Sequence, residues 1–180
     1  MTDKKKFVLP ERIGDRQELN EGGPAPADFG PLARDRIPVR SMTEADLPAL
    51  IAIDRGIVGR DRARYFERKL TEALHESDMR VSLVAEADGR PVGFVMARVN
   101  FGEFGRTEAA AEMDTIGIDP AYRDRGIGRA LLSQLFANLA TLRIEKVLTE
   151  IDWSNVELLA FLSHSDFKPS SRLAFELSLT

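Results

Sequence analysis

The sequence predicts a mixed α/β domain in which strands and amphipathic helices alternate from residue 37 onward. Two local patterns carry most of this prediction. Residues 115–132 begin as an apolar strand, turn at Pro120 and continue as an apolar helix after Gly128. Residues 87–90 read Ala-Asp-Gly-Arg between two apolar runs, and Asp-Gly in that position is a strong signal for a β-hairpin.

The composition is that of a globular domain, and it argues against several kinds of function. Of the 180 residues, 43% are hydrophobic and 30% are charged, with a net charge of −4 that offers nucleic acid no overall attraction. Without cysteine the chain has no disulfide, thiolate metal site or cysteine nucleophile, which suits the cytoplasm. No stretch is long and apolar enough to span a membrane. His75 and His164 lack further ligands at metal spacing, so we expect no metal.

The first part of the chain, residues 1–36, is predicted to be a leader, and the folded domain is expected to span residues 37–180. The eight glycines and prolines of the leader interrupt any helical or strand period. We therefore expect a disordered segment. The alternative is that Phe29 or the apolar run Phe7-Val8-Leu9 docks on the domain or on a second subunit. The possibility that the protein forms a homodimer is kept as a further alternative.

The domain is expected to begin with a short strand, Ile37-Pro38-Val39-Arg40, which two helices follow. Thr43 and Asp46 have the spacing of a helix N-cap and the third residue of the helix, so the first helix should start at Thr43. Apolar residues at helical spacing continue this helix until Gly56 and Gly59, which we expect to break it.

A second amphipathic helix is predicted over residues 61–76, because its apolar residues fall on one line at helical spacing. The simplest interpretation of its basic residues is a solvated face made of Arg62, Arg64 and Arg68. An alternative is that the region between the two helices meets an acidic acceptor through Arg55, Arg60 and Arg62.

The remaining elements follow from alternating or apolar runs. We expect strands at 81–86, 91–99 and 112–118, a helix after Gly128, a strand at 146–151, a helix at 156–163 and a final strand at 172–179. The final strand is predicted because Leu173, Phe175, Leu177 and Leu179 fall at every second position and would share one face.

The turn between the strand at 112–118 and the following helix combines features of a phosphate-binding loop. Gly126 and Gly128 lack a Cβ atom, which allows the backbone to approach a ligand closely. The helix that follows begins with unpaired N–H donors and the positive end of its dipole. Three arginines, Arg123, Arg125 and Arg129, surround this turn. Together these features favour phosphate binding over the alternative, a surface turn with solvated arginines.

The same stretch resembles the signature of the GNAT acetyltransferase superfamily, in which two spaced apolar residues precede a proline, an arginine and a pair of glycines. The matching residues are Ile116, Ile118, Pro120, Arg123, Gly126 and Gly128. The resemblance extends over residues 37–180 and is sharp between residues 112 and 167. It implies a GNAT fold, with a central mixed, mostly antiparallel sheet flanked by helices. In that fold the strands at 112–118 and 146–151 would splay apart, and acetyl-coenzyme A would lie between them.

The resemblance also implies which residues would bind acetyl-coenzyme A as co-substrate. Backbone groups of Ile116, Gly117 and Ile118 would face the pantetheine and the acetyl carbonyl. The pyrophosphate would lie on the loop formed by Arg123, Asp124, Arg125, Gly126, Ile127, Gly128 and Arg129. Asn155 matches the family asparagine that contacts the pantetheine, although it is equally suited to be a simple N-cap.

The reaction that this implies is attack of a neutral amine on the acetyl thioester, for which a general base is useful near pH 7. Two carboxylates match bases of the family. Glu112 matches the base of the histone-acetylating branch, and Glu150 matches the water-binding glutamate of the branch that acetylates ribosomal-protein N-termini. Asp114 is a third, weaker candidate, because the two-residue period places it on the face of Glu112. The alternative for each of these carboxylates is that it is an ordinary charged residue on the protein surface.

One position departs from the family pattern. The tyrosine that usually protonates the departing thiolate is replaced by Leu162, which we expect to share the cofactor-facing side of the helix with Asn155. The sequence thus predicts an N-acetyltransferase that acts by direct transfer on a primary amine, with a weak preference for a protein or peptide acceptor. The alternatives are a small-molecule amine acetyltransferase and a non-catalytic module that binds acyl-coenzyme A.

Overall fold

The computed structural model of the chain describes residues 36–76, 79, 81–101, 109–171 and 176–179. The predicted leader therefore lies outside the described residues, apart from Arg36. The main elements are β1 (Val39–Ser41), α2 (Leu47–Val58), α3 (Ala63–Thr71), β2 (Leu83–Ala87), β3 (Arg90–Phe101), β4 (Ala109–Ile118), α4 (Ile127–Thr141), β5 (Val147–Leu148) and α5 (Val156–Ser163).

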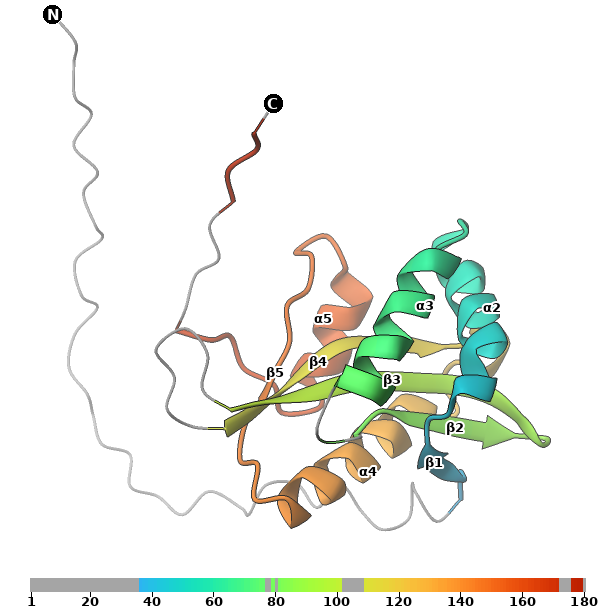
Figure 1. Cartoon of the computed structure of the whole chain (residues 1–180), viewed down its shortest axis with the longest axis horizontal. Helices are drawn as coiled ribbons and strands as arrows, with labels where there is room; N and C mark the ends of the chain where they lie inside the picture. The colour runs from blue at the N-terminus through green and yellow to red at the C-terminus, as the bar shows by residue number, and fades with distance from the viewer. Residues whose placement is uncertain (1–35, 77–78, 80, 102–108, 172–175, 180) are drawn as a thin grey trace, which may run out of the picture.

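The strands of the described chain form one five-stranded sheet in the order β1-β2-β3-β4-β5. The first four strands pair antiparallel with their neighbours. Helix α4 then carries the chain across to β5, which pairs parallel to β4. This mixed, mostly antiparallel sheet with helices on both faces confirms the predicted fold class (Figure 1).

Two apolar clusters cover the two faces of the sheet. On one face, α4 packs its fully buried Leu131 and Leu135 against β2, β3 and β4. On the other face, α2 and α3 cover the sheet, and the rings of Phe66 in α3 and Phe94 in β3 meet edge to face with centroids 5.6 Å apart. Burial of apolar surface on both faces fixes the end of β4 and the start of α4 between two packed layers.

The start of the first helical segment was predicted correctly, whereas its end was predicted too early. Thr43 caps a short 3-10 turn (Glu44–Asp46) that leads into α2, and its N–H donates to Asp46 Oδ2 at 2.8 Å. The prediction that Gly56 breaks the helix is wrong, because α2 runs through Gly56 to Val58. A Cβ on Gly56 would lie 3.4 Å from Cδ of Pro120, an ordinary van der Waals contact, so α2 passes beside the turn after β4. Gly59 ends the helix with φ 71°.

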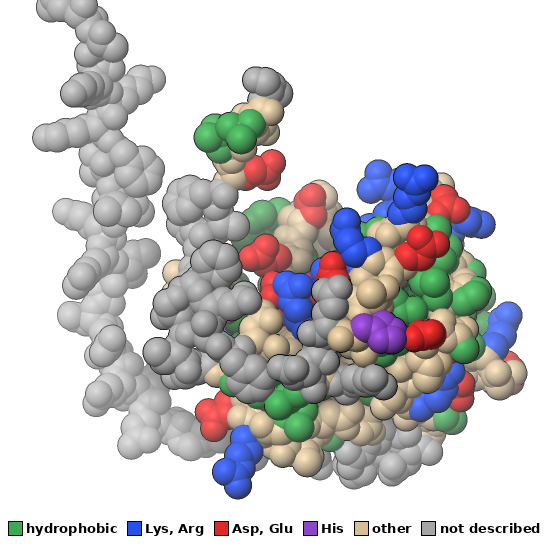
Figure 2. Space-filling view, viewed as in Figure 1, with side chains coloured by type: hydrophobic (Ala, Val, Ile, Leu, Met, Phe, Trp, Pro, Cys, Tyr) green, Lys and Arg blue, Asp and Glu red, His purple; other side chains and the backbone are tan. Residues whose placement is uncertain are grey.

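The second predicted helix is present as α3 followed by a π-helical turn (Glu72–Glu76). The expectation that its arginines form a purely solvated face is wrong for Arg62, which donates to the buried Asp54 at 2.9 Å. Arg55 in turn forms an ion pair with Asp61. The exposed arginines that remain include Arg60 and Arg64, and Figure 2 shows basic side chains gathered where α2 leads into α3.

The β-hairpin between β2 and β3 is confirmed. Asp88 and Gly89 form its turn with φ of 53° and 72°, the left-handed values that a two-residue hairpin turn requires. The structure differs from the sequence prediction for the last two strands. The strand predicted at 146–151 contains only Val147–Leu148. Residues 172–175 of the predicted final strand lie outside the described residues, and 176–179 form no strand, with Leu177 82% exposed.

Asp46 should make the stability of the domain depend on acid pH. Its side chain is 4% exposed and accepts two hydrogen bonds from Arg40, at 2.8 and 2.7 Å. Burial alone would raise the pKa of this carboxyl, but the hydrogen bonds from Arg40 and Thr43 outweigh burial and hold the pKa below its usual value. The stabilisation is therefore present above the pKa of the unfolded state, about 3.9, and is lost as pH falls below it.

We expect Asp46→Asn to lower the free energy of unfolding by about 1–3 kcal/mol at pH 7, because a buried charge-assisted pair is broken. The difference from the wild-type protein should be smaller at about pH 3 than at pH 7, because the contribution of the charged pair is lost as the pH falls below the unfolded pKa of about 3.9. Urea unfolding of both proteins at the two pH values measures this. A difference that stays constant with pH would contradict the assigned role of the charge.

Candidate functional site

Strands β4 and β5 pair over only a short distance and then separate. Their register includes Ala111 with Val147 and Glu112 with Leu148, and Ala111 N–H donates to the Lys146 carbonyl at 2.8 Å. One residue further on, a side chain replaces the backbone ladder, because Thr149 Oγ1 donates to the Met113 carbonyl at 2.9 Å. No described residue after Leu148 pairs with the rest of β4. The predicted gap between the two strands is therefore present, and Thr149 lies at its closed end.

Strand β4 has a bulge where this gap opens. Met96 of β3 pairs with Thr115, whereas the next residue, Ala97, pairs with Met113, so Asp114 has no partner across the strands. A bulge bends its strand and increases the local twist. Met113 and Ile116 both pack against the α4 side of the sheet, although they are three positions apart. The extra residue thus reorients the second half of β4 relative to its first half.

The loop between β4 and α4 is shaped by local polar and backbone features. Asp119 Oδ1 accepts from the Ala121 N–H at 2.9 Å and fixes a 3-10 turn (Pro120–Tyr122). Gly126 follows with φ 80°, and α4 starts at Ile127, earlier than the position after Gly128 that was predicted. A Cβ built on Gly126 would meet no atom within 4 Å. Gly126 therefore combines a left-handed backbone with open space in front of a helix N-terminus, an arrangement that suits an anion.

The other two glycines of the predicted site are explained by packing. A Cβ on Gly128 would lie 3.0 Å from Ile118 and from the ring of Phe161, so this glycine lets α4 approach β4 and α5. A Cβ on Gly117 would lie 2.7 Å from the ring of Phe94 on the opposite face of the sheet. Among these three glycines, Gly126 is the one that packing does not explain.

The three arginines of the loop are exposed and point to different neighbours. Arg123 Nη1 lies 3.3 Å from Glu157 Oε2 in the first turn of α5. Arg125 lies over the ring of Tyr122, with its Cζ atom 4.8 Å from the ring centroid. Arg129 projects from the first turn of α4. Asp124, between the first two arginines, adopts a positive φ of 60°.

The first base candidate, Glu112, is held in a polar network on the α3 side of the sheet. Its Oε2 accepts from Arg98 Nη2 at 2.9 Å and from Asn100 Nδ2 at 2.8 Å. Burial acts to raise the pKa of Glu112, but Arg98 and Asn100 lower it, and the net result lies below the usual value. Such a carboxylate is charged at neutral pH and is a weakened base.

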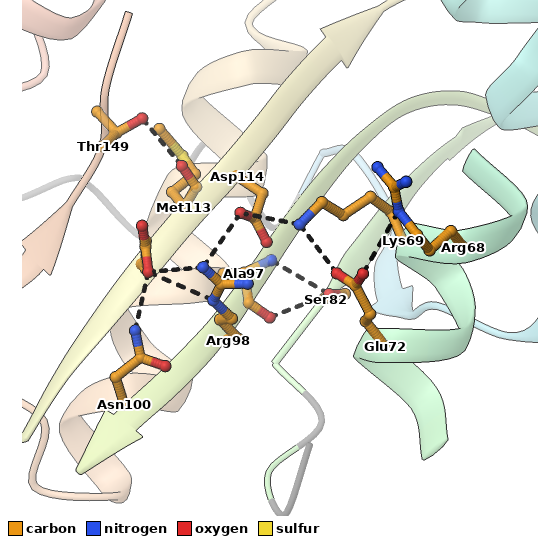
Figure 3. Close-up of polar contacts among 11 residues, drawn as sticks. Arg68, Lys69, Glu72, Ser82, Ala97, Arg98, Asn100, Met113, Asp114 and Thr149 are labelled. Carbon is orange, nitrogen blue, oxygen red and sulfur yellow. Dashed lines mark hydrogen bonds and ion pairs between the residues drawn. The ribbon is translucent and has the colours of Figure 1, made fainter. Parts of the chain in front are cut away.

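Asp114 belongs to the same network, which confirms that it shares a face with Glu112. Its Oδ1 lies 3.9 Å from Arg98 and 3.5 Å from Lys69, and Lys69 also pairs with Glu72 of the following helical turn at 2.9 Å. Figure 3 shows Arg98 and Lys69 pointing toward Asp114 from β3 and α3. Each of the two acids is thus neutralised by a nearby cation.

The second base candidate, Glu150, has a different environment. It is exposed and forms no hydrogen bond or ion pair with another residue in the part of the chain that the structure describes. It follows Thr149, whose hydroxyl ties the chain to β4 at the closed end of the gap. Glu150 therefore stands at the gap without a fixed partner.

Asn155 and Leu162 at the two ends of α5 differ in their exposure. Asn155 is exposed and caps α5, and its Oδ1 accepts from the Leu158 N–H at 3.1 Å. Leu162, which was predicted to share the cofactor-facing side with Asn155, is 4% exposed and packs in the core cluster with residues of α4. A tyrosine at this position would have to fit into that core.

Several residues of the site were not anticipated from the sequence. Arg98 and Asn100 reach Glu112 from β3, and Thr149 bridges the two separating strands. Their roles depend on the register between β3 and β4 and on the parallel pairing of β5. A signal was available for Arg98 alone, because opposite charges often face each other across neighbouring strands.

Neither a metal site nor a membrane span was found in the described residues. No group of three or more potential ligands among them has the arrangement of a metal centre. No helix in these ranges has the length and apolar character needed to cross a membrane.

Comparison with known proteins agrees with these features. A model of the acetyltransferase (GNAT) family matches residues 47–167, well over half of the chain. An uncharacterized N-acetyltransferase of Methanocaldococcus jannaschii is 31% identical over 101 residues, covering 53% of this chain and 45% of that protein. The match thus spans less than half the length of this curated relative.

Two solved structures illustrate the likeness in fold. The aminoglycoside N-acetyltransferase AAC(6')-Iy in complex with coenzyme A superposes with a TM-score of 0.67 and 16% identity, covering 79% of this chain and 94% of that one. The ribosomal-protein-S18-alanine N-acetyltransferase from Escherichia coli has a TM-score of 0.62 and 21% identity, covering 75% and 79%. At such identities the likeness concerns the fold.

Proposed function

The chain belongs to the GNAT family of acetyltransferases, and we propose that it transfers an acetyl group from acetyl-coenzyme A directly to a primary amine. The observation that carries this proposal is the separation of β4 from β5 beside the open, left-handed Gly126 at the start of α4. Two strands that separate beside a helix N-terminus suit a long, narrow thioester with a pyrophosphate at its middle.

The residues around the gap fit coenzyme A. The first N–H groups of α4 are free to bind the pyrophosphate because Gly126 leaves the space in front of them open. The loop from Arg123 to Arg129 would add positive charge there, with Asp124 and Ile127 contributing backbone groups. Backbone groups of Ile116, Gly117 and Ile118 would line the pantetheine, with Asn155 on the opposite side through the part of its amide that the cap leaves free.

We assign the general base to Glu150 and not to Glu112. A base must take a proton from the amine, directly or through one water molecule. Glu112 is neutralised by Arg98 and has a lowered pKa, so it holds a proton poorly. Glu150 has no fixed partner in the described structure and follows the residue that closes the gap. Backbone N–H groups near the bulge of β4 would stabilise the oxyanion that develops on the acetyl carbonyl.

The acceptor that we favour is a protein or peptide amine, from the spacing of Glu150 and Asn155 that resembles the branch acetylating ribosomal-protein N-termini. One structural neighbour is such an enzyme, the ribosomal-protein-S18-alanine N-acetyltransferase. The second candidate is a small-molecule amine, because another neighbour is an aminoglycoside N-acetyltransferase. The cysteine-free composition suits a cytoplasmic setting for either reaction.

A thiol-release assay with acetyl-coenzyme A tests the proposal against peptides with free N-termini, lysine peptides, aminoglycosides and polyamines. We expect turnover with at least one peptide amine, and each positive acceptor should be checked for the mass of one added acetyl group. Turnover with aminoglycosides or polyamines alone would assign a small-molecule acceptor. Tight coenzyme A binding without turnover on any amine would overturn the enzymatic role and favour a binding module.

A further inference from the structure

A surface cavity of about 570 Å³ lies beside the proposed pyrophosphate loop, on the side of α4 that faces β1. It is bordered by the start of β1, the β2–β3 hairpin, the turn after β4 and the first residue of α4. The residues that matter for its chemistry are Arg36, Asp88, Tyr122, Arg125 and Ile127. No role has been given to this cavity so far.

Tyr122 lines this cavity, and two arginine side chains lie against its ring: Arg125, which also lines the cavity, and Arg90 beside it. Arg90 in the hairpin donates to the Tyr122 hydroxyl at 3.0 Å, and its Cζ atom lies 5.3 Å from the ring centroid. Arg125 lies 4.8 Å from the same centroid. The Tyr122 hydroxyl in turn donates to Asp88 Oδ2 at 3.3 Å, which ties the ring to the hairpin. Cation–π contacts of this kind keep guanidinium groups in place.

Within the described ranges, the arginines at this edge are not taken up in ion pairs, although Tyr122 and, more weakly, the nearby Asp119 and Asp88 raise the pKa of Arg90. Two acidic residues, Asp88 and Glu86, line the cavity. Glu86 forms an ion pair with Arg40 at 2.8 Å. Neither Arg90 nor Arg125 forms an ion pair with a carboxylate among the described residues, and Arg36 adds a third cation. Guanidinium groups with free donors are preferred partners of phosphate, which they bind through paired hydrogen bonds.

The cavity lies next to the place where we put the pyrophosphate of coenzyme A. Arg125 precedes Gly126, and Ile127 is both the first residue of α4 and part of the cavity wall. Coenzyme A has a pantetheine on one side of its pyrophosphate and an adenosine with a 3′-phosphate on the other. Since the pantetheine would occupy the gap between β4 and β5, the nucleotide must leave the loop in another direction.

We propose that Arg90 and Arg125, held by Tyr122, bind the 3′-phosphate of coenzyme A at the edge of this cavity. The protein then selects coenzyme A over its 3′-dephospho form. This inference rests on the proposed function. A 3′-phosphate carries a charge of about −1.5 to −2 at pH 7, and hydrogen bonds to charged groups of this kind correspond to roughly a 10- to 100-fold difference in affinity.

Calorimetric titration with coenzyme A and with 3′-dephospho-coenzyme A tests this proposal without any acceptor. We expect the wild-type protein to bind coenzyme A about 10- to 100-fold more tightly than the dephospho form. Arg90→Gln should reduce this ratio toward one by weakening coenzyme A binding, while binding of the dephospho form is retained. Tyr122→Phe, which removes the hydroxyl that holds Arg90, should reduce the ratio less. Arg64→Gln is the matched control, because this exposed arginine lies on α3 at the opposite face of the sheet.

The outcomes separate this inference from the proposed function. Equal affinities of the wild-type protein for the two ligands would overturn the inference and leave the acetyltransferase proposal intact. A ratio that survives Arg90→Gln and Arg125→Gln would also overturn it. Failure to bind either ligand would overturn the proposed function itself. Because the wild-type ratio is decisive, the test does not depend on the folding of any variant.

Discussion

Replacement of Glu150 by glutamine is expected to lower kcat by about 10²–10⁴-fold at neutral pH, which is the usual contribution of a general base. Glutamine keeps the shape of the side chain and removes the charge that accepts the proton. Affinity for coenzyme A should change little, because glutamine keeps the size of the side chain and the pyrophosphate loop is untouched. The rate of the variant should partly recover at high pH, where more of the acceptor amine is already neutral.

Glu112→Gln is the matched comparison, because Glu112 lies on β4 and Glu150 follows β5, the two strands that separate at the gap. The carboxylate of Glu112 is engaged by Arg98 and Asn100, so the change should affect the local packing of β3 and β4 more than the rate. The measurement is kcat against pH for both variants on one acceptor. A larger loss for Glu112→Gln would reverse the assignment. Small and equal losses would mean that neither glutamate is the base.

The features that were predicted correctly from the sequence depend on a few neighbouring residues. The Asp88-Gly89 turn requires two left-handed residues, and the dipeptide itself provides them. Asn155 caps α5 through the N–H of Leu158, three residues later. The order of helices and strands could therefore be predicted well, since each signal and the structure that it encodes lie within one turn or one helix.

The errors arise where contacts with distant parts of the chain decide the outcome. Glycine inside a helix costs only about 1 kcal/mol, and the packing of α2 on the sheet outweighs this cost at Gly56. The alternating leucines near the C-terminus indicated a strand, but a strand needs a partner, and 176–179 have none among the described residues. Arg62 appeared to belong to a solvated face because Asp54, its buried partner, lies on another helix.

The sequence predicted where in the fold the candidate site would lie, but it did not predict which cations would surround its carboxylates. The spacing of Ile116, Ile118, Gly126 and Gly128 located the gap and the loop, because these residues are adjacent in sequence. The cation that neutralises Glu112 comes from β3, and its position depends on the register and on the bulge at Asp114. No local pattern contains that information, so the two base candidates became distinguishable only in the folded chain.

The largest effect on cofactor binding is expected for Gly126→Asp, which should weaken coenzyme A affinity by at least about 100-fold. The side chain of this residue would point into open space in front of α4, where we place the pyrophosphate. A carboxylate there repels the phosphates and competes for the free N–H groups of the helix, and losing charge-assisted hydrogen bonds alone accounts for about a tenfold to hundredfold change.

Gly126→Asn is the control that isolates the charge. Asparagine and aspartate have nearly the same shape, and both tolerate the left-handed backbone at φ 80° better than most residues do. The asparagine variant should therefore fold with a similar melting temperature and lose much less affinity in a calorimetric titration. If the aspartate variant binds coenzyme A as tightly as the asparagine variant does, then the pyrophosphate lies elsewhere and the assignment of the loop is wrong.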